Sequence, residues 1–290
     1  MFKKQYEYYL RLVEKYLNSL PFKEKQNLIG ESMAYSLLSG GKRIRPVLAL
    51  ACVELVGGQP RQFIQAAAAL EMIHTYSLIH DDLPAMDNDD YRRGKLSNHK
   101  MFGETAAILA GDALLTFAFE MLAEPLEVSP ARQLRVIKET AQAAGWQGMV
   151  LGQVLDTLGN EQQGTLAEIE NVHRKKTAAL LIASARLGAI LGGGTEREID
   201  LLTKYADYLG LAFQIQDDIL DVIGESDILG KPTGSDQKLA KSTYPSLLGL
   251  SGAQEHLNKT IRLAKEQLEY FGTKANFLIS LADYVAERNN

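Results

Sequence analysis

The sequence predicts an all-α protein built as a bundle of about ten helices. Ala, Leu, Glu, Lys and Gln dominate its long segments, and these residues favour helix. Runs of alternating β-branched residues, which would indicate strands, are absent. Near the start of the chain, apolar side chains fall on one helical face before Pro21, namely Tyr6, Tyr9, Leu10, Val13 and Leu17. We therefore expect no substantial sheet.

Start and stop signals divide the remaining chain into helices. They are Pro46 opening a helix that stops at Gly57-Gly58, Ser129-Pro130 as a cap with a first-turn proline, and capping boxes at Thr165 to Glu168 and Thr195 to Glu198. The sequence has no Pro/Ser-rich linker, charge block or fixed-period repeat. One region, residues 82–100, is irregular and rich in Asp, Arg, Gly and Asn. We expect this region to cover a functional cleft.

The composition excludes several classes of protein. Hydrophobic residues make up 46% of the 290 residues and charged residues 23%, which is typical of globular rather than disordered chains. The net charge of -5 argues against a nucleic-acid-binding surface. Cys52 is the only cysteine, and the first residues lack the apolar run of a signal peptide. We expect a cytoplasmic protein without a transmembrane segment, because apolar stretches such as 177–194 are interrupted by Arg186 or by glycines.

The first aspartate cluster consists of Asp81, Asp82 and Asp87. It follows an apolar helical segment that Pro84 should end. Asp81 and Asp87 are six positions apart, so a regular helix would not align them. The turn after Asp82 must therefore fold Asp87 back if the two residues share a metal.

The second cluster lies within another apolar helical segment, where Asp217 and Asp221 are spaced i, i+4 on one face. Like charges at this spacing repel each other, and a cation between them would relieve the repulsion. Carboxylate and water oxygens suit octahedral Mg²⁺, which often completes its shell with substrate phosphates. A solvated helix end would explain one such cluster. Two of them, each after apolar helical sequence, favour magnesium binding.

Several segments match the motifs of a known family in order and spacing. They are Gly40 to Pro46 (GGKRIRP), His74 to Asp82 (HTYSLIHDD), Arg92 to Gly94 (RRG), Lys176-Thr177, Phe213 to Asp218 (FQIQDD) and Lys241 to Pro245 (KSTYP). On these residues the chain resembles the trans-prenyltransferases, specifically bacterial farnesyl diphosphate synthases, over nearly its whole length. The resemblance implies one domain over residues 1–290 with the isoprenoid synthase fold around a deep central cavity. It also implies a homodimer.

The resemblance assigns basic and polar residues to two diphosphate substrates. Isopentenyl diphosphate would be bound by Lys42, Arg45, His74 and Arg93. The allylic diphosphate would be bound by Arg92, Lys176, Lys231 and Lys241, with Thr177 and Gln214 lining the reacting carbon. Lys176 is preferred to Lys175 because Lys-Thr is the family dipeptide. Without the resemblance, a lone Lys/Arg pair would be read as solvated surface and a lone histidine as part of the core.

The resemblance also implies a mechanism. Asp81, Asp87, Asp217 and Asp221 would hold magnesium, three ions when substrate is bound, with Mn²⁺ as an alternative. The allylic diphosphate would ionise, the double bond of isopentenyl diphosphate would attack the cation, and the released diphosphate would remove the proton, so neither His74 nor His80 is assigned as a base. The catalytic set is Asp81, Asp82, Asp87, Lys176, Thr177, Gln214 and Asp217. An apolar cavity is needed because water would capture the cation.

Tyr76 and Ser77 are the candidates for control of product length. Tyr76 lies roughly 7 Å along a helix from Asp81, so its ring could form a cavity floor that stops the product at C15. It is also about 140° around the helix from Asp81, whereas Ser77 is better aligned, and a core-packing role for Tyr76 stays open.

Other activities remain as alternatives. A geranylgeranyl diphosphate synthase would share the chemistry, whereas a terpene cyclase, a silent partner subunit or a helical scaffold fits less well because every motif is complete. The tail, Arg288 to Asn290, is less basic than in some relatives, so the resemblance does not support a role for it at the isopentenyl diphosphate site.

Overall fold

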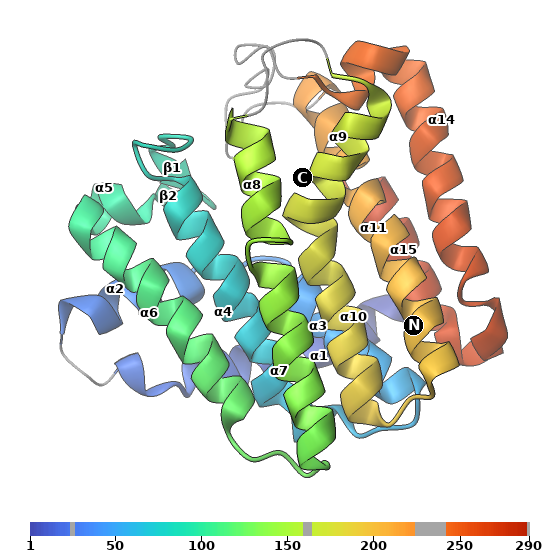
Figure 1. The fold of residues 1–290 in the computed structure, drawn as a ribbon, viewed down its shortest axis with the longest axis horizontal. Helices are drawn as coiled ribbons and strands as arrows, with labels where there is room; N and C mark the ends of the chain where they lie inside the picture. The colour runs from blue at the N-terminus through green and yellow to red at the C-terminus, as the bar shows by residue number, and fades with distance from the viewer. Residues whose placement is uncertain (24–26, 159–163, 224–241, 289–290) are drawn as a thin grey trace.

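The computed structural model describes residues 1–23, 27–158, 164–223 and 242–288, and this part of the chain is almost entirely helical (Figure 1). Its α-helices are α1 (Phe2–Asn18), α2 (Leu28–Leu37), α3 (Ile44–Leu55), α4 (Ile64–Asp81), α5 (Asn98–Phe102), α6 (Glu104–Ala123), α7 (Pro130–Ala144), α8 (Met149–Leu158), α9 (Leu166–His173), α10 (Ala179–Gly192), α11 (Glu196–Ile223), α14 (Tyr244–Glu266) and α15 (Asn276–Glu287). All except α5 and α9 have at least ten residues, which confirms the predicted all-α class with about ten substantial helices.

Most helices begin and end where the sequence signals predicted, but α3 begins at Ile44, two residues before Pro46, which was expected to open it. The first helix ends before Pro21, where a short 3₁₀ helix, Pro21–Lys23, begins. The Ser129 hydroxyl accepts the N–H of Arg132 at the start of α7. Both capping boxes form: the side chains of Thr165 and Thr195 accept backbone N–H groups three residues on, and the glutamates there accept the N–H of each threonine. Local sequence therefore sets these boundaries.

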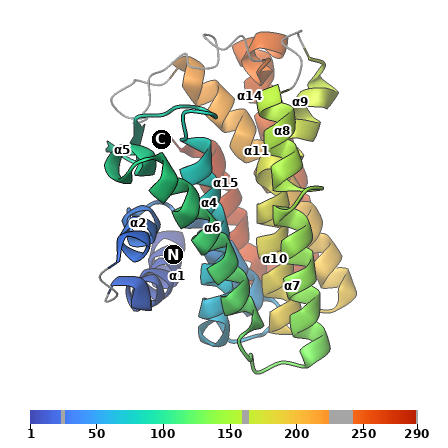
Figure 2. The ribbon, with the colours of Figure 1, turned by 60° about the vertical axis from the view of Figure 1, so that its left-hand side comes forward.

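The interior is formed by helices that are buried around most of their circumference. Helix α4 buries an unbroken run from Ala66 to Ile73, and α10 buries Leu187 to Leu191. Figure 2 shows α4 beside α6, and α10 beside α7. Helices apolar on all sides must lie inside other layers, which explains why α3, α4 and α10 pack against one another at the centre.

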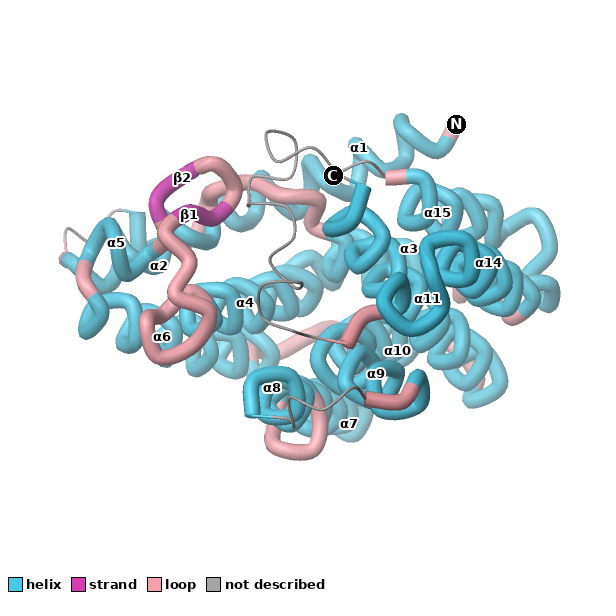
Figure 3. The backbone as a smooth tube through the Cα atoms, turned by 90° about the horizontal axis from the view of Figure 1, so that it is seen from above, coloured by secondary structure: helices cyan, strands magenta, loops and turns pink. Residues whose placement is uncertain are grey.

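Both aspartate clusters lie at the same end of the bundle. Helices α4 and α11 each reach the upper end in Figure 1 with their last turns. A small antiparallel hairpin, β1 (Tyr91–Arg92) and β2 (Lys95–Leu96), lies at this end too, as the view from above shows (Figure 3). Residues 82–100, expected to cover a cleft, therefore lie at the helix ends that carry the first cluster.

Helix α6 bears on the expectation that no segment spans a membrane. Among the described residues, it alone is long and apolar enough to do so by length and composition. Seven of its residues, including Ala107, Ala110 and Leu114, are buried, and the helix packs against α4, α2 and α5. This packing accounts for part of its apolar composition, while Ile108 and Leu109 face outward.

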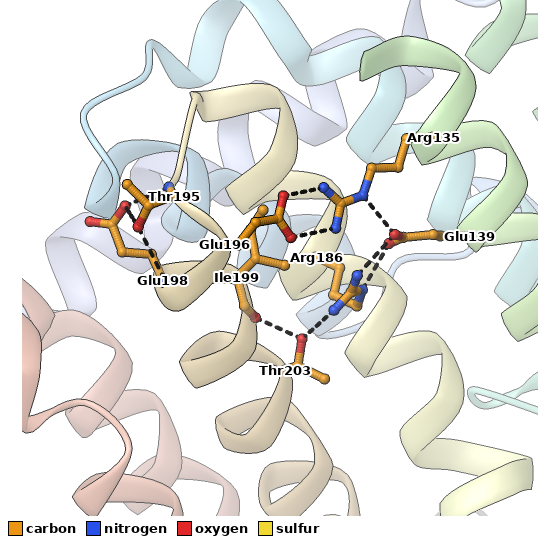
Figure 4. Close-up of polar contacts among 8 residues, drawn as sticks. All are labelled: Arg135, Glu139, Arg186, Thr195, Glu196, Glu198, Ile199 and Thr203. Carbon is orange, nitrogen blue, oxygen red and sulfur yellow. Dashed lines mark hydrogen bonds and ion pairs between the residues drawn. The ribbon is translucent and has the colours of Figure 1, made fainter. Parts of the chain in front are cut away.

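A polar network joins α7, α10 and α11 away from the aspartate end (Figure 4). Arg186 donates twice to Glu139, through Nε at 2.8 Å and Nη2 at 2.9 Å, and Arg135 Nε donates to the same carboxylate at 2.9 Å. Arg135 also binds Glu196, and Arg186 donates to the Thr203 hydroxyl at 2.8 Å. Burial alone would raise the pKa of Glu139, but the hydrogen bonds from Arg186 and Arg135 outweigh it and lower that pKa.

We expect Glu139→Gln to lower the free energy of unfolding by about 1 to 3 kcal/mol at pH 7, because two partly buried guanidinium groups lose their shared acceptor charge. Since the pKa of Glu139 is depressed in the folded state, this contribution is present above the unfolded pKa of glutamate and is lost as the pH falls through the folded pKa. Urea unfolding at pH 7 and pH 3 checks it. The exposed Glu255→Gln is the control, and equal stability of the two variants at pH 7 would contradict the prediction.

Candidate active site

The turn after α4 folds Asp87 back toward Asp81. Pro84 follows the helix end, and the N–H of Asp87 donates to the carbonyl of Asp81 at 2.9 Å. The N–H groups of Met86 and Asn88 both donate to the Leu83 carbonyl, at 2.9 and 3.1 Å. The geometric condition for a shared metal, stated from the sequence, is therefore met by the backbone.

Asp81 is a half-buried carboxyl group with further carboxylates beside it. Burial raises its pKa, the charge of Lys176 opposes that rise, and the charges of Asp87 and Asp82 add to it, so that the pKa reaches about 6. A raised carboxyl pKa means that negative charge at this position is incompletely balanced by the protein. A divalent cation would balance it.

Asp82 has a different environment from Asp81. It is 2% exposed, and Arg92 donates to it from Nε at 2.9 Å and from Nη2. The same guanidinium reaches Asp89 at 3.1 Å. Asp82 therefore orients Arg92 at the edge of the hairpin. In this structure Asp82 is a structural partner of that arginine.

The second cluster divides its three aspartates in the same way. Asp217 and Asp221 share one face of α11, and the side chain of Asp217 is 43% exposed. Asp218 is buried and accepts the backbone N–H of Tyr244 at 3.0 Å, which ties the start of α14 to α11. Its role in this structure is thus to join two helices.

A cavity of about 370 Å³ gathers most of the basic residues named from the sequence. Its lining includes Lys42, Arg45, His74, Arg92, Arg93 and Thr177, together with apolar side chains of Leu78, Leu181 and Phe213. The cavity is thus basic in one part and apolar in another. Such a lining suits a ligand with a phosphate group and a hydrocarbon chain.

Burial and crowding of positive charge control the titration of these groups. Burial lowers the pKa of Arg45 to about 10, with the charge of Glu71 opposing and that of Arg93 adding to the effect. Burial, followed by the charges of Arg45, Arg93 and other arginines, lowers the pKa of His74 well below its usual value. His74 is therefore neutral at pH 7 and has both a donor and an acceptor nitrogen.

Arg43, which sequence reasoning passed over, holds this basic group in place. It is the left-handed residue before α3, with φ of +50°, and is 2% exposed. Its guanidinium donates to Glu14 at 2.8 Å, to Glu71 at 2.7 Å and to the Leu37 carbonyl at 2.6 Å. Arg43 borders the cavity together with Lys42 and Arg45, but its guanidinium is fully buried. A charged residue in a left-handed N-cap carries no recognisable sequence signal.

Gly41 permits the close approach of Arg93 to this turn. Its φ is +119°, and a Cβ atom there would lie 2.8 Å from the Arg93 guanidinium carbon. Arg93 donates to the Gly40 carbonyl and lies 3.8 Å from Glu71. The glycine pair therefore brings the hairpin arginine against the loop that carries Lys42.

A π-helix places Lys176 and Thr177. The segment Arg174–Ala178 widens by one residue before α10, an irregularity that often marks functional positions. Lys176 Nζ lies 2.7 Å from Asp156 of α8, and its charge acts on Asp81. Lys175, in contrast, donates to the Gln147 carbonyl at 3.2 Å in an exposed position. The structure therefore favours Lys176, as the family dipeptide did.

The π-helix contacts α8 and α11 through residues that the sequence motifs identify only in part. Asp156 is an isolated acid on the mostly apolar helix α8 and belongs to none of the motifs. Gly152, one turn earlier, lies so close to the π-helix that a Cβ would be 2.1 Å from the Lys176 nitrogen. Thr177 and Gln214 are joined by a hydrogen bond from the threonine hydroxyl to the amide oxygen, so the two predicted neighbours are in contact.

The predicted product-length residues lie beside the cavity lining rather than in it. Tyr76 is buried with its ring edge-on to His80, and His80 Nε2 lies 3.0 Å from the Ile108 carbonyl of α6. Burial, followed by the charge of Asp81, raises the pKa of Tyr76 to about 12. The Ser77 hydroxyl donates to the His74 carbonyl at 2.9 Å. Neither is among the residues that line the cavity, so their roles stay predictions. Lys231 and Lys241 lie outside the described residues.

The described carboxylates suit magnesium that is completed by a substrate. Among these residues, no group of three or more metal-binding side chains comes together. The aspartates form two pairs instead, Asp81 with Asp87 and Asp217 with Asp221. Mg²⁺ commonly takes one or two carboxylates and fills its remaining positions with water and phosphate oxygens. The raised pKa of Asp81 fits a position that awaits such a cation.

Comparison with known proteins identifies the family. The Polyprenyl synthetase family profile matches residues 26–273. The chain is 51% identical to geranylgeranyl pyrophosphate synthase of Capsicum annuum over 282 residues, covering 96% of this chain and 76% of that protein. It is 50% identical to farnesyl diphosphate synthase of Geobacillus stearothermophilus over 262 residues, covering 90% and 88%.

Among solved structures, an FPP/GFPP synthase from Zymomonas mobilis aligns with a TM-score of 0.87 at 37% identity, covering 98% of both chains. A putative farnesyl-diphosphate synthase from Marinomonas aligns with a TM-score of 0.84 at 40% identity, covering 99% of both. The names of these relatives include geranylgeranyl pyrophosphate, farnesyl diphosphate and FPP/GFPP synthases, so they agree on the family but not on one product. With its isoprenoid synthase fold, its paired aspartates and its basic cavity, the chain belongs to the polyprenyl synthetase family of trans-prenyltransferases, which elongate prenyl diphosphates.

Proposed function

We propose that this prenyltransferase joins isopentenyl diphosphate to dimethylallyl or geranyl diphosphate and releases (2E,6E)-farnesyl diphosphate. The observation that carries the proposal is the cavity of about 370 Å³, which is lined by Lys42, Arg45, His74 and Arg93. Its lining also includes Leu78 and Phe213, which precede Asp81 on α4 and Asp217 on α11 by about one turn. Two diphosphates brought together need balancing charge on each side. Basic side chains supply it for one substrate, and carboxylate-bound magnesium supplies it for the other.

The residues of the chain bind, orient and shield the reactants. Lys42, Arg45 and Arg93 would hold the diphosphate of isopentenyl diphosphate, and neutral His74 would add a hydrogen bond. Lys176 and Arg92, each held by an aspartate, would contact the allylic diphosphate. Leu78, Leu181 and Phe213 would keep water from the allylic cation. Magnesium at Asp81 and Asp87 and at Asp217 and Asp221 would stabilise the departing diphosphate.

The proposal of farnesyl diphosphate as the product is based on the aromatic side chain of Tyr76. Its ring packs edge-on against His80, and His80 lies so close to Gly111 of α6 that a Cβ there would not fit. A rigid ring close to Asp81 is suited to stopping the growing chain. The identity to geranylgeranyl pyrophosphate synthases favours the longer C20 product as the second candidate.

The direct test incubates the protein with labelled isopentenyl diphosphate and geranyl diphosphate, in the presence of about 5 mM MgCl₂ or of EDTA. We expect a C15 product with magnesium and none with EDTA, measured by chromatography of the dephosphorylated alcohols. A cyclic hydrocarbon without incorporated label would indicate a terpene cyclase, and no product would contradict an enzymatic role.

Matched variants connect that activity to the aspartate pairs. Asp81→Asn and Asp217→Asn should each lower turnover by about 10²-fold or more while circular dichroism stays unchanged, because both remove charge that holds metal. Asp200→Asn, an exposed position on the same helix as Asp217, is the control and should retain activity. Near-normal turnover in both site variants would defeat the metal assignment.

The product-length role of Tyr76 predicts that Tyr76→Ala makes prenyl chains longer than C15, because removing the ring opens space beside His80 of α4. Chromatography of the products after reaction with excess isopentenyl diphosphate measures the change. Tyr208→Ala, a half-buried tyrosine on α11, controls for a general loosening of the fold. An unaltered C15 product from folded Tyr76→Ala would assign the ring to core packing.

We also propose a homodimer, formed through the outward face of α6. Ile108 and Leu109 on α6 and Val150, Val154 and Leu158 on α8 are exposed, an unusual number of apolar side chains for a solvated surface. Sedimentation velocity should give a dimer, and the pair Ile108→Glu and Leu109→Glu should convert it to a monomer. Leu250→Glu, exposed on α14, should leave it dimeric. A monomeric wild-type protein would contradict the proposal.

A further inference from the structure

Arg288, which follows α15, has a buried side chain in contact with α11. The side chain is 4% exposed, and its guanidinium carbon lies 3.6 Å from the centre of the Phe213 ring. Its Nη2 donates to the Phe213 carbonyl at 2.7 Å, and the Gln216 amide donates to the Arg288 carbonyl at 2.9 Å. Both the side chain and the backbone of Arg288 are therefore attached to the helix that carries the second aspartate cluster.

The same Nη2 atom also binds the first carboxylate of that cluster. It lies 2.6 Å from Oδ1 of Asp217, whose side chain is 43% exposed. Charge-assisted hydrogen bonds of this length are among the stronger polar contacts in proteins. The Arg288 Nε atom is buried and, among the described residues, has no hydrogen-bond partner. The Arg288 guanidinium is therefore held by the Phe213 ring, by the Phe213 carbonyl and by the charge of Asp217.

Asp217 also interacts with the positive charge of Lys42. Burial lowers the pKa of Lys42, the charge of Arg288 lowers it further, and the charge of Asp217 raises it. Arg288 and Lys42 thus both place positive charge near Asp217. A divalent ion at Asp217 would stand within a few ångströms of the guanidinium group, and two cations at that distance repel each other strongly.

We propose that Arg288 is the resident counter-ion of Asp217 and that a divalent cation must displace it to bind the second aspartate cluster. The inference rests on the proposed function, in which Asp217 is a metal ligand. After displacement, the guanidinium can remain over the Phe213 ring, because a cation–π contact stabilises an arginine without a carboxylate. Arg288 therefore lowers the cation affinity of Asp217.

The test measures binding of Mn²⁺ alone, without substrate, from the electron paramagnetic resonance signal of the free ion. Removing the competing charge with Arg288→Gln should tighten Mn²⁺ binding roughly threefold to tenfold. Arg288→Lys keeps the charge but lacks the planar guanidinium, so its Mn²⁺ affinity should lie between those of the wild type and Arg288→Gln. This variant tests the proposal if Arg288→Gln does not fold. Arg262→Gln, an exposed arginine on α14, should bind Mn²⁺ as the wild type does.

A double-mutant comparison separates this inference from the metal assignment. In an Asp217→Asn background, Arg288→Gln should no longer change Mn²⁺ affinity, because the shared carboxylate is gone. Unchanged or weaker Mn²⁺ binding by Arg288→Gln, while Asp217→Asn still reduces binding, would overturn the exchange and leave Asp217 as a ligand. If Asp217→Asn did not alter Mn²⁺ binding at all, both the exchange and the metal role of Asp217 would be rejected.

Discussion

Like charges held close together in a poorly solvated place govern the organisation of this site. Asp81, Asp82 and Asp87 gather at the end of α4, and Arg45, Arg92 and Arg93 gather around the cavity beside it. Such groups repel each other and lose hydration when buried, so each set is stable only with opposite charge nearby. Protein residues supply part of this charge. For the remainder, a diphosphate and divalent cations are well suited.

The structure shows which charged residues the fold itself uses. In the loop before α3, Lys42, Arg43 and Arg45 all border the cavity, but the Arg43 guanidinium is fully buried and bound to Glu14 and Glu71. Asp82 and Asp218, each next to a candidate metal ligand, bind Arg92 and the backbone of Tyr244 instead. Adjacent residues of one type therefore divide between supporting the site and facing the substrate, as successive side chains on a turn or helix point in different directions.

Irregular backbone places several of the important side chains. Arg43 and Arg93 both have positive φ, Gly41 admits the Arg93 guanidinium, and a π-helix positions Lys176 and Thr177. These conformations are less favourable than regular helix, and the surrounding helices fix them by packing. The rigid interior of α3, α4 and α10 thus supports an upper end in which local geometry departs from the regular bundle.

The sequence by itself determined the all-α class, the helix boundaries at Ser129, Thr165 and Thr195, and the residue types of the two aspartate pairs. These follow from local propensity, capping and spacing, which act over a few neighbouring residues. Only the tertiary structure decided that Arg43 is sealed in the core, that Asp156 holds Lys176, and that Arg288 lies against Asp217. Each of these contacts joins residues 20 or more positions apart, and the pairing of distant charges depends on how whole helices pack rather than on any pattern along the chain.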